Sequence, residues 1–93
     1  MKAFKEFLLE DTLAEQTVYL PAGAEVVSVS KSSKGIQLLV IAPPKGYETS
    51  LPEIRTFKIC LTDENFPGYA LKYIGSFMSD IGSKHVIEIR KEY

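Results

Sequence analysis

His85 is the only histidine in the chain, and histidine is the natural candidate for acid or base chemistry because imidazoles as a class titrate near neutral pH. It begins an apolar run with the same parity as Ile87 and Ile89, which predicts a side chain on the apolar side of a strand. The nearest acids in the sequence are Asp80 and Glu88, and neither forms an obvious catalytic pair with it. A structural histidine at the margin of a sheet is therefore the favoured interpretation, and a lone histidine gives no basis for a zinc site.

Arg55 and Tyr73 are candidates for ligand binding. An arginine can hold a carboxylate or phosphate through two hydrogen bonds, and Arg55 begins a well-patterned strand after a long loop, where it could lie at a sheet rim. The competing interpretation is a surface ion pair with Glu53 or a neighbouring acid. Tyr73, like Tyr47 and Tyr69, can stack on a base, anchor a protein interface or simply cap a small core.

The remaining residues carry no recognisable catalytic pattern. Cys60 is the single cysteine and lies in an apolar run, so it is interpreted as a small buried hydrophobe. The segment 31–35 lacks the spacing of a phosphate-binding loop, and no nucleophile elbow, paired metal ligands or dinucleotide fingerprint is present. We therefore expect no catalytic residues, no metal and no cofactor, and predict that the protein is not an enzyme.

Composition limits the classes of protein that fit. The 93 residues predict one domain, 1–93, and a hydrophobic content of 45% is normal for a globular fold. The net charge is −1 and no basic block occurs, so duplex nucleic acid is not an expected partner. No apolar run approaches the ~20 residues of a membrane span. We expect a cytoplasmic protein that does not bind membranes.

Short apolar or alternating runs separated by turn residues dominate the chain, which predicts an all-β fold of about six or seven strands in a compact antiparallel sandwich or partly open barrel. Residues 3–9 fit either a strand or a helical stripe, and residues 12–15 could form one short helical turn. A long loop is predicted over residues 43–52. The remaining predicted strands are 16–20, 25–30, 36–42, 55–61, 71–77 and 84–90.

Three details of this pattern bear on assembly. Gly35 suits a left-handed position in a hairpin, and Gly75 interrupts a strand, which indicates a bulge, a bend or a close approach. Residues 36–42 are apolar on both faces except at Gln37, so this strand is predicted to be covered on both sides, either by its own chain or by another subunit. We therefore expect a homo-oligomer, which would also protect the open sheet edges.

The order of several weak motifs resembles a family of small uncharacterised proteins of tailed phages and prophages, classified as a β-rich domain of unknown function. The loop at residues 62–68 is longer and more acidic than the glycine-rich turn typical of that family, so any ligand held there is expected to differ. The stretches that carry the resemblance are 16–24, 26–29, 55–57, 71–77 and 85–88.

This resemblance implies a phage origin but no activity. By analogy with phage biology, the favoured expectation is a counter-defence sponge in the cytoplasm of an infected bacterium. It would sequester a host immune nucleotide signal, a cyclic dinucleotide or an ADP-ribose type, and Arg55, Tyr73 and His85 are its candidate ligand contacts. The alternatives are a protein that binds and inhibits a host defence complex, through a sheet edge or a tyrosine-rich patch, and a minor virion or assembly protein.

Overall fold

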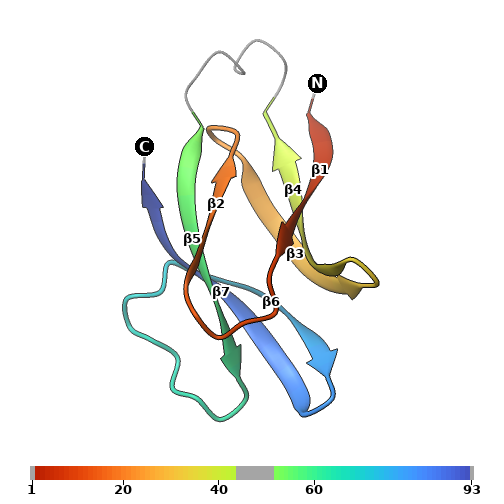
Figure 1. Ribbon diagram of the computed structural model, residues 1–93. Coiled ribbons are helices and arrows are strands. Elements are labelled where there is room, and N and C mark those ends of the chain that lie inside the picture. The colour runs from red at the N-terminus through yellow and green to blue at the C-terminus, as the bar shows by residue number, and fades with distance from the viewer. Residues whose placement is uncertain (1, 44–51, 93) are drawn as a thin grey trace.

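Strands in two antiparallel sheets make up the regular structure (Figure 1). The computed structural model describes residues 2–43 and 52–92, and within these ranges it contains no helix, so the all-β prediction is confirmed. The strands are β1 (Ala3–Leu9), β2 (Gln16–Leu20), β3 (Glu25–Ser32), β4 (Gly35–Ala42), β5 (Glu53–Leu61), β6 (Lys72–Ser79) and β7 (Gly82–Glu92).

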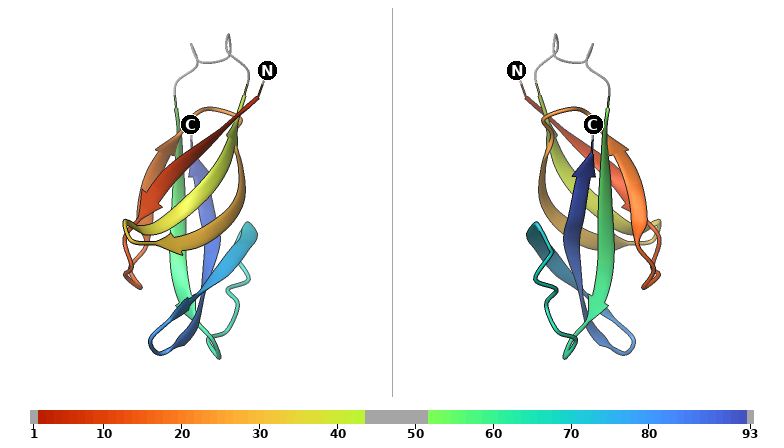
Figure 2. Two further views of the ribbon diagram at one scale, coloured as in Figure 1. Left: turned by 90° about the vertical axis from the view of Figure 1, so that its right-hand side faces the viewer. Right: turned by 90° about the vertical axis from the view of Figure 1, so that its left-hand side faces the viewer.

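The smaller sheet has the order β1-β4-β3 and the larger one the order β2-β5-β7-β6. Figure 2 shows them as two layers, with the smaller sheet crossing one end of the long strands β5 and β7. At the β3–β6 side, Lys72 Nζ donates to the carbonyl of Val26 at 3.0 Å, which ties the two sheets together without a strand ladder. The fold is therefore a sandwich that does not close into a barrel.

The core is formed by buried side chains that occupy alternate positions along the strands. On β4, every second residue from Ile36 to Ala42 is buried, and Phe57 and Ile59 of β5 meet them from the other sheet. This period of two is what a half-buried strand requires. The main core consists of Leu9, Leu20, Ala24, Val26, Ile36, Leu38, Val40, Phe57, Ile59, Ile74, Phe77 and Val86.

The N-terminal residues 3–9, which fitted either a strand or a helix, form a strand. Residues 3–9 pair with β4 along their whole length, with Phe7 packed against the core while Phe4 and Leu8 lie exposed on the outer face. The predicted helical turn at 12–15 was wrong. Here the chain passes from one sheet to the other, and the Gln16 side chain accepts from the Glu10 N–H and donates to its carbonyl, both at 2.8 Å. These bonds hold an irregular loop instead of a helix.

Residues 36–42 were predicted to form a strand that is covered on both faces, and this is confirmed for one face. β4 is the central strand of its sheet, and its inner face is buried by the chain itself. On its outer face, Gln37, Leu39 and Ile41 are only partly buried. The predicted loop over 43–52, with Tyr47, lies outside the described residues except at its two ends.

Both glycine predictions are confirmed. Gly35 closes the β3–β4 hairpin with φ 125°, a conformation that side chains rarely adopt. At Gly75 the β6–β7 register shifts, and a Cβ built there would lie 3.1 Å from Cγ1 of Val29 on β3. The missing side chain lets the edges of the two sheets approach closely. In the described part of the chain, no helix is present that could cross a membrane.

Candidate functional site

The outer face of the larger sheet carries a second apolar layer, separate from the main core. Cys60 of β5 and Ile87 and Ile89 of β7 form it, and Ala70 from the β5–β6 connection packs over them. This connection runs across the face instead of turning tightly into β6 (Figure 1). The loop and the sheet together enclose the candidate site.

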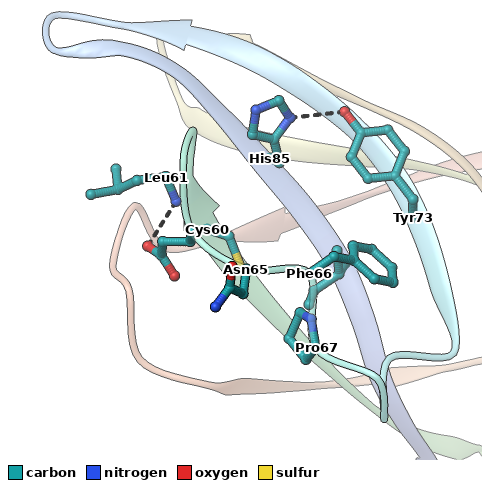
Figure 3. Close-up of a pocket in the computed structure, with 9 residues that line it drawn as sticks. Cys60, Leu61, Asn65, Phe66, Pro67, Tyr73 and His85 are labelled. Atoms are coloured by element: carbon teal, nitrogen blue, oxygen red, sulfur yellow. Dashed lines mark hydrogen bonds between the residues drawn. The ribbon is translucent and has the colours of Figure 1, made fainter.

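The site is a pocket of about 80 Å³ between this loop, β5, β6 and β7. Figure 3 shows the rings of Tyr73 and Phe66 on the same side of it, with His85 at the opposite end from Pro67. Both aromatic rings reach solvent, since Phe66 is 60% exposed and Tyr73 is 49% exposed. The lining residues are Cys60, Leu61, Glu64, Asn65, Phe66, Pro67, Tyr73, His85 and Ile87.

A chain of hydrogen bonds fixes His85 at one end of the pocket. The Tyr73 hydroxyl lies 2.9 Å from Nδ1, and the Thr62 hydroxyl lies 3.0 Å from Nε2. Because Thr62 donates its own proton to the carbonyl of Ser83 at 3.0 Å, its oxygen must accept from Nε2–H. In the neutral imidazole Nδ1 is then an acceptor, and Tyr73 donates to it. The imidazole is thus the Nε2–H tautomer, and both nitrogens are engaged.

This arrangement suits binding more than proton transfer. The Tyr73 proton and the His85 Nε2 proton are each already donated to a neighbour. Burial, the largest influence, raises the pKa of the Cys60 thiol, and nearby Glu64 acts in the same direction while Lys58 opposes it. A thiol kept protonated is a poor nucleophile. Among the described residues no group of three or more potential metal ligands occurs.

Arg55 lies elsewhere, and the expectation that it occupies a sheet rim is corrected. Its side chain is buried between the sheets, where Nη2 donates to Glu88 Oε1 at 3.0 Å and Nε donates to the other oxygen of Glu88. Nη1 donates to the carbonyl of Ala24 at 2.7 Å and to Glu53 at 3.3 Å. The predicted ion pair with Glu53 exists, but it is buried and secondary to Glu88.

The buried network has a structural role. Glu53 also accepts from the N–H of Gly23, so the guanidinium and the two carboxylates bind the β2–β3 turn to β5 and β7. Burial alone would lower the pKa of Arg55, but the hydrogen bond and charge of Glu88, assisted by Glu53, outweigh it and raise this pKa above its ordinary value. Arg55 is therefore a permanently charged structural residue with its donors directed inward.

Of the three predicted contacts, the structure brings Tyr73 and His85 together and leaves Arg55 out. It adds Thr62, Glu64, Asn65 and Phe66, which come from the loop that departs from the family pattern. The unusual length and acidity of that loop were the only sequence signal for these residues. Their convergence on β6 and β7 depends on the path of the loop over the sheet.

No curated protein and no solved structure matches the chain. A family model described as a domain of unknown function, DUF7352, matches residues 5–92. The match extends over both sheets and the pocket. The chain therefore belongs to the DUF7352 family.

Proposed function

We propose that this protein is a non-enzymatic binding domain that recognises a protein partner by inserting one of the partner's side chains into the pocket beside Tyr73 and His85. The observation that carries this proposal is the pair of exposed rings, Phe66 and Tyr73, at a small preformed pocket. Exposed aromatic residues around a pocket are typical of the anchor points of protein interfaces. Tyr69 and Leu71, in the same connection between β5 and β6, are also exposed.

The size of the pocket favours a side chain over a whole small molecule. An apolar cavity of about 150 Å³ can enclose a benzene molecule, and this pocket has about 80 Å³. It can hold the end of one side chain while the rest of the partner spreads over the rim. In the phage setting that the sequence resemblance implies, the partner would be a protein of a host defence complex, and binding would inhibit it.

Selection of peptides from a random display library tests this proposal. Peptides that bind the wild-type protein are expected to lose at least about tenfold in affinity when Phe66 or Tyr73 is replaced by alanine. Tyr19→Ala, at an exposed tyrosine on β2 that does not line the pocket, is the matched control and should have no effect. Peptides that bind all the variants equally would contradict the proposal.

A nucleotide signal is the second candidate ligand, and the exposed ring of Tyr73 favours it because a base can stack there. Arg55 cannot serve as its phosphate partner, since its donors are occupied by Glu88, Glu53 and Ala24. Thermal unfolding with cyclic dinucleotides and ADP-ribose separates the two proposals. A ligand at a hundred times its dissociation constant stabilises the folded state by about 2.7 kcal/mol. If none of these nucleotides raises the melting temperature, the proposal of a nucleotide sponge is contradicted.

A further inference from the structure

We infer that the side chain accepted by the pocket is a cation, the guanidinium of an arginine or the ammonium of a lysine on the partner protein. This inference rests on the proposed function and specifies the chemistry of the anchor. Among the described residues that line the pocket, Glu64 carries the only full charge, and no lysine or arginine is present. The charge on the lining thus favours a cationic group, and the nearby lysine, Lys58, lies outside the lining residues at 4.0 Å from Glu64 Oε2.

Glu64 has one oxygen that makes no hydrogen bond with the described residues. Its Oε1 accepts from the N–H of Leu61 at 2.9 Å, which holds the carboxylate at the pocket. Its Oε2 lies 4.0 Å from Lys58 Nζ, beyond hydrogen-bonding distance, and both side chains are partly exposed. A contact of this kind contributes little. An incoming cation can therefore bind Oε2 without displacing a strong internal partner.

The aromatic lining favours the same ligand. Phe66 and Tyr73 present rings to the pocket, and a cation over an aromatic face is attracted by the ring quadrupole. Tyr73 cannot use its hydroxyl proton for an anion, since it already donates to His85. His85 donates in turn to Thr62, so neither polar group offers a free proton. The carbonyl oxygen of the Asn65 side chain adds a further acceptor.

The test uses three small probes that differ at the end of the side chain: Nα-acetyl-arginine amide, the neutral isostere Nα-acetyl-citrulline amide, and Nα-acetyl-leucine amide. Each is titrated into the full-length protein while amide chemical shifts are followed by NMR. The arginine probe is expected to shift resonances of the 62–68 loop, Tyr73 and His85, with a dissociation constant at least about fivefold below that of citrulline. Raising the salt concentration should reduce this preference.

Two variants test whether the preference for arginine over citrulline depends on the Glu64 carboxylate and the Phe66 ring. Glu64→Gln keeps a carbonyl acceptor for the Leu61 N–H but removes the charge, so the arginine-to-citrulline ratio should fall toward one. Phe66→Leu keeps an apolar side chain but removes the ring, and arginine should bind about two- to fivefold more weakly. Glu15→Gln, at an acid outside the pocket that pairs with Arg90, should leave the ratio unchanged.

The outcomes separate this inference from the proposed function. Citrulline or leucine binding as tightly as arginine, or a ratio that survives in Glu64→Gln, would overturn the cationic anchor. Failure of all three probes to shift the pocket resonances would overturn it as well. In each case the proposed function still stands or falls on the peptides selected by display, whose dependence on Phe66 and Tyr73 is measured independently.

Discussion

Arg55 and Glu88, 33 positions apart in the chain, face each other between the two sheets and form a bidentate ion pair whose side chains are 7% and 4% exposed. The pair joins β5 to β7, and its bonds to Ala24 and Glu53 extend it to the β2–β3 turn. Two carboxylates face the single guanidinium, so the three buried groups carry a net charge of −1, and none of the described buried side-chain polar atoms lacks a hydrogen-bond partner. The pair therefore lies on the inner face of the larger sheet, and the candidate pocket lies on its opposite face.

Glu88→Gln is expected to lower the free energy of unfolding by about 2 kcal/mol, because it replaces the carboxylate that accepts two charge-assisted hydrogen bonds from Arg55 with an amide that has one acceptor oxygen. Urea denaturation followed by circular dichroism measures the loss. The matched control is Glu15→Gln in the exposed pair with Arg90, which should change stability by less than about 1 kcal/mol. Equal effects of the two substitutions would show that the buried pair has no special role.

Gly75 and Val29 are predicted to be coupled. A methyl group added at Gly75 would lie 3.1 Å from Cγ1 of Val29, so Gly75→Ala should destabilise the wild-type protein. In a Val29→Ala background the space is free, and the same change should be neutral or stabilising because alanine loses less backbone entropy than glycine. A double-mutant cycle is expected to give a coupling of about 1 kcal/mol, and additivity within about 0.3 kcal/mol would contradict the close approach.

The hydrogen-bond chain predicts the Nε2–H tautomer for His85. Long-range ¹H–¹⁵N NMR at pH 8 should show a protonated Nε2 and an unprotonated Nδ1. Tyr73→Phe removes a donor from Nδ1 but not the Thr62 acceptor, so the tautomer should persist and stability should fall by about 1 kcal/mol or less. A mixture of tautomers in the wild-type protein would refute the assignment.

The buried thiol of Cys60 should lower the stability of the folded protein at alkaline pH. Burial raises the pKa of its thiol in the folded state, so above the ordinary value of 9.0 the unfolded chain loses this proton while the folded protein keeps it. The unfolded state then binds fewer protons, and stability falls as pH rises until the folded-state pKa is passed. Urea denaturation between pH 8 and pH 10 should show a steeper decline for the wild type than for Cys60→Ala, by up to about 1.4 kcal/mol per pH unit. Parallel slopes would contradict this explanation.

Much of the fold could be predicted from local patterns. Apolar residues at alternate positions, such as Phe57 and Ile59, predict a strand directly from the local sequence. Gly35 predicts a hairpin turn in the same way, because glycine readily adopts a positive φ. The helical turn at 12–15 was predicted wrongly because its outcome depends on Gln16, whose amide bonds to Glu10 only after the chain has crossed between the sheets.

The candidate site was only partly predictable for the same reason. Tyr73 and His85 lie on adjacent strands of a recognisable hairpin, so their proximity follows from local pairing. Arg55 was predicted at a rim, since nothing in the sequence places Glu88 opposite it. Phe66 and Glu64 reach the pocket only because the 62–71 segment folds back over the outer face of the larger sheet.

The sequence by itself therefore determined that this protein is built from antiparallel strands, where its hairpins turn, and that Gly75 interrupts the regular pattern of its strand. Those features follow from side-chain periodicity and backbone sterics, which act over a few residues. Only the tertiary structure decided that Arg55 is an internal ion-pair partner and that an acidic loop completes an aromatic pocket. Burial and charge pairing depend on which distant segments meet, and that choice is made by the packing of the two sheets as a whole.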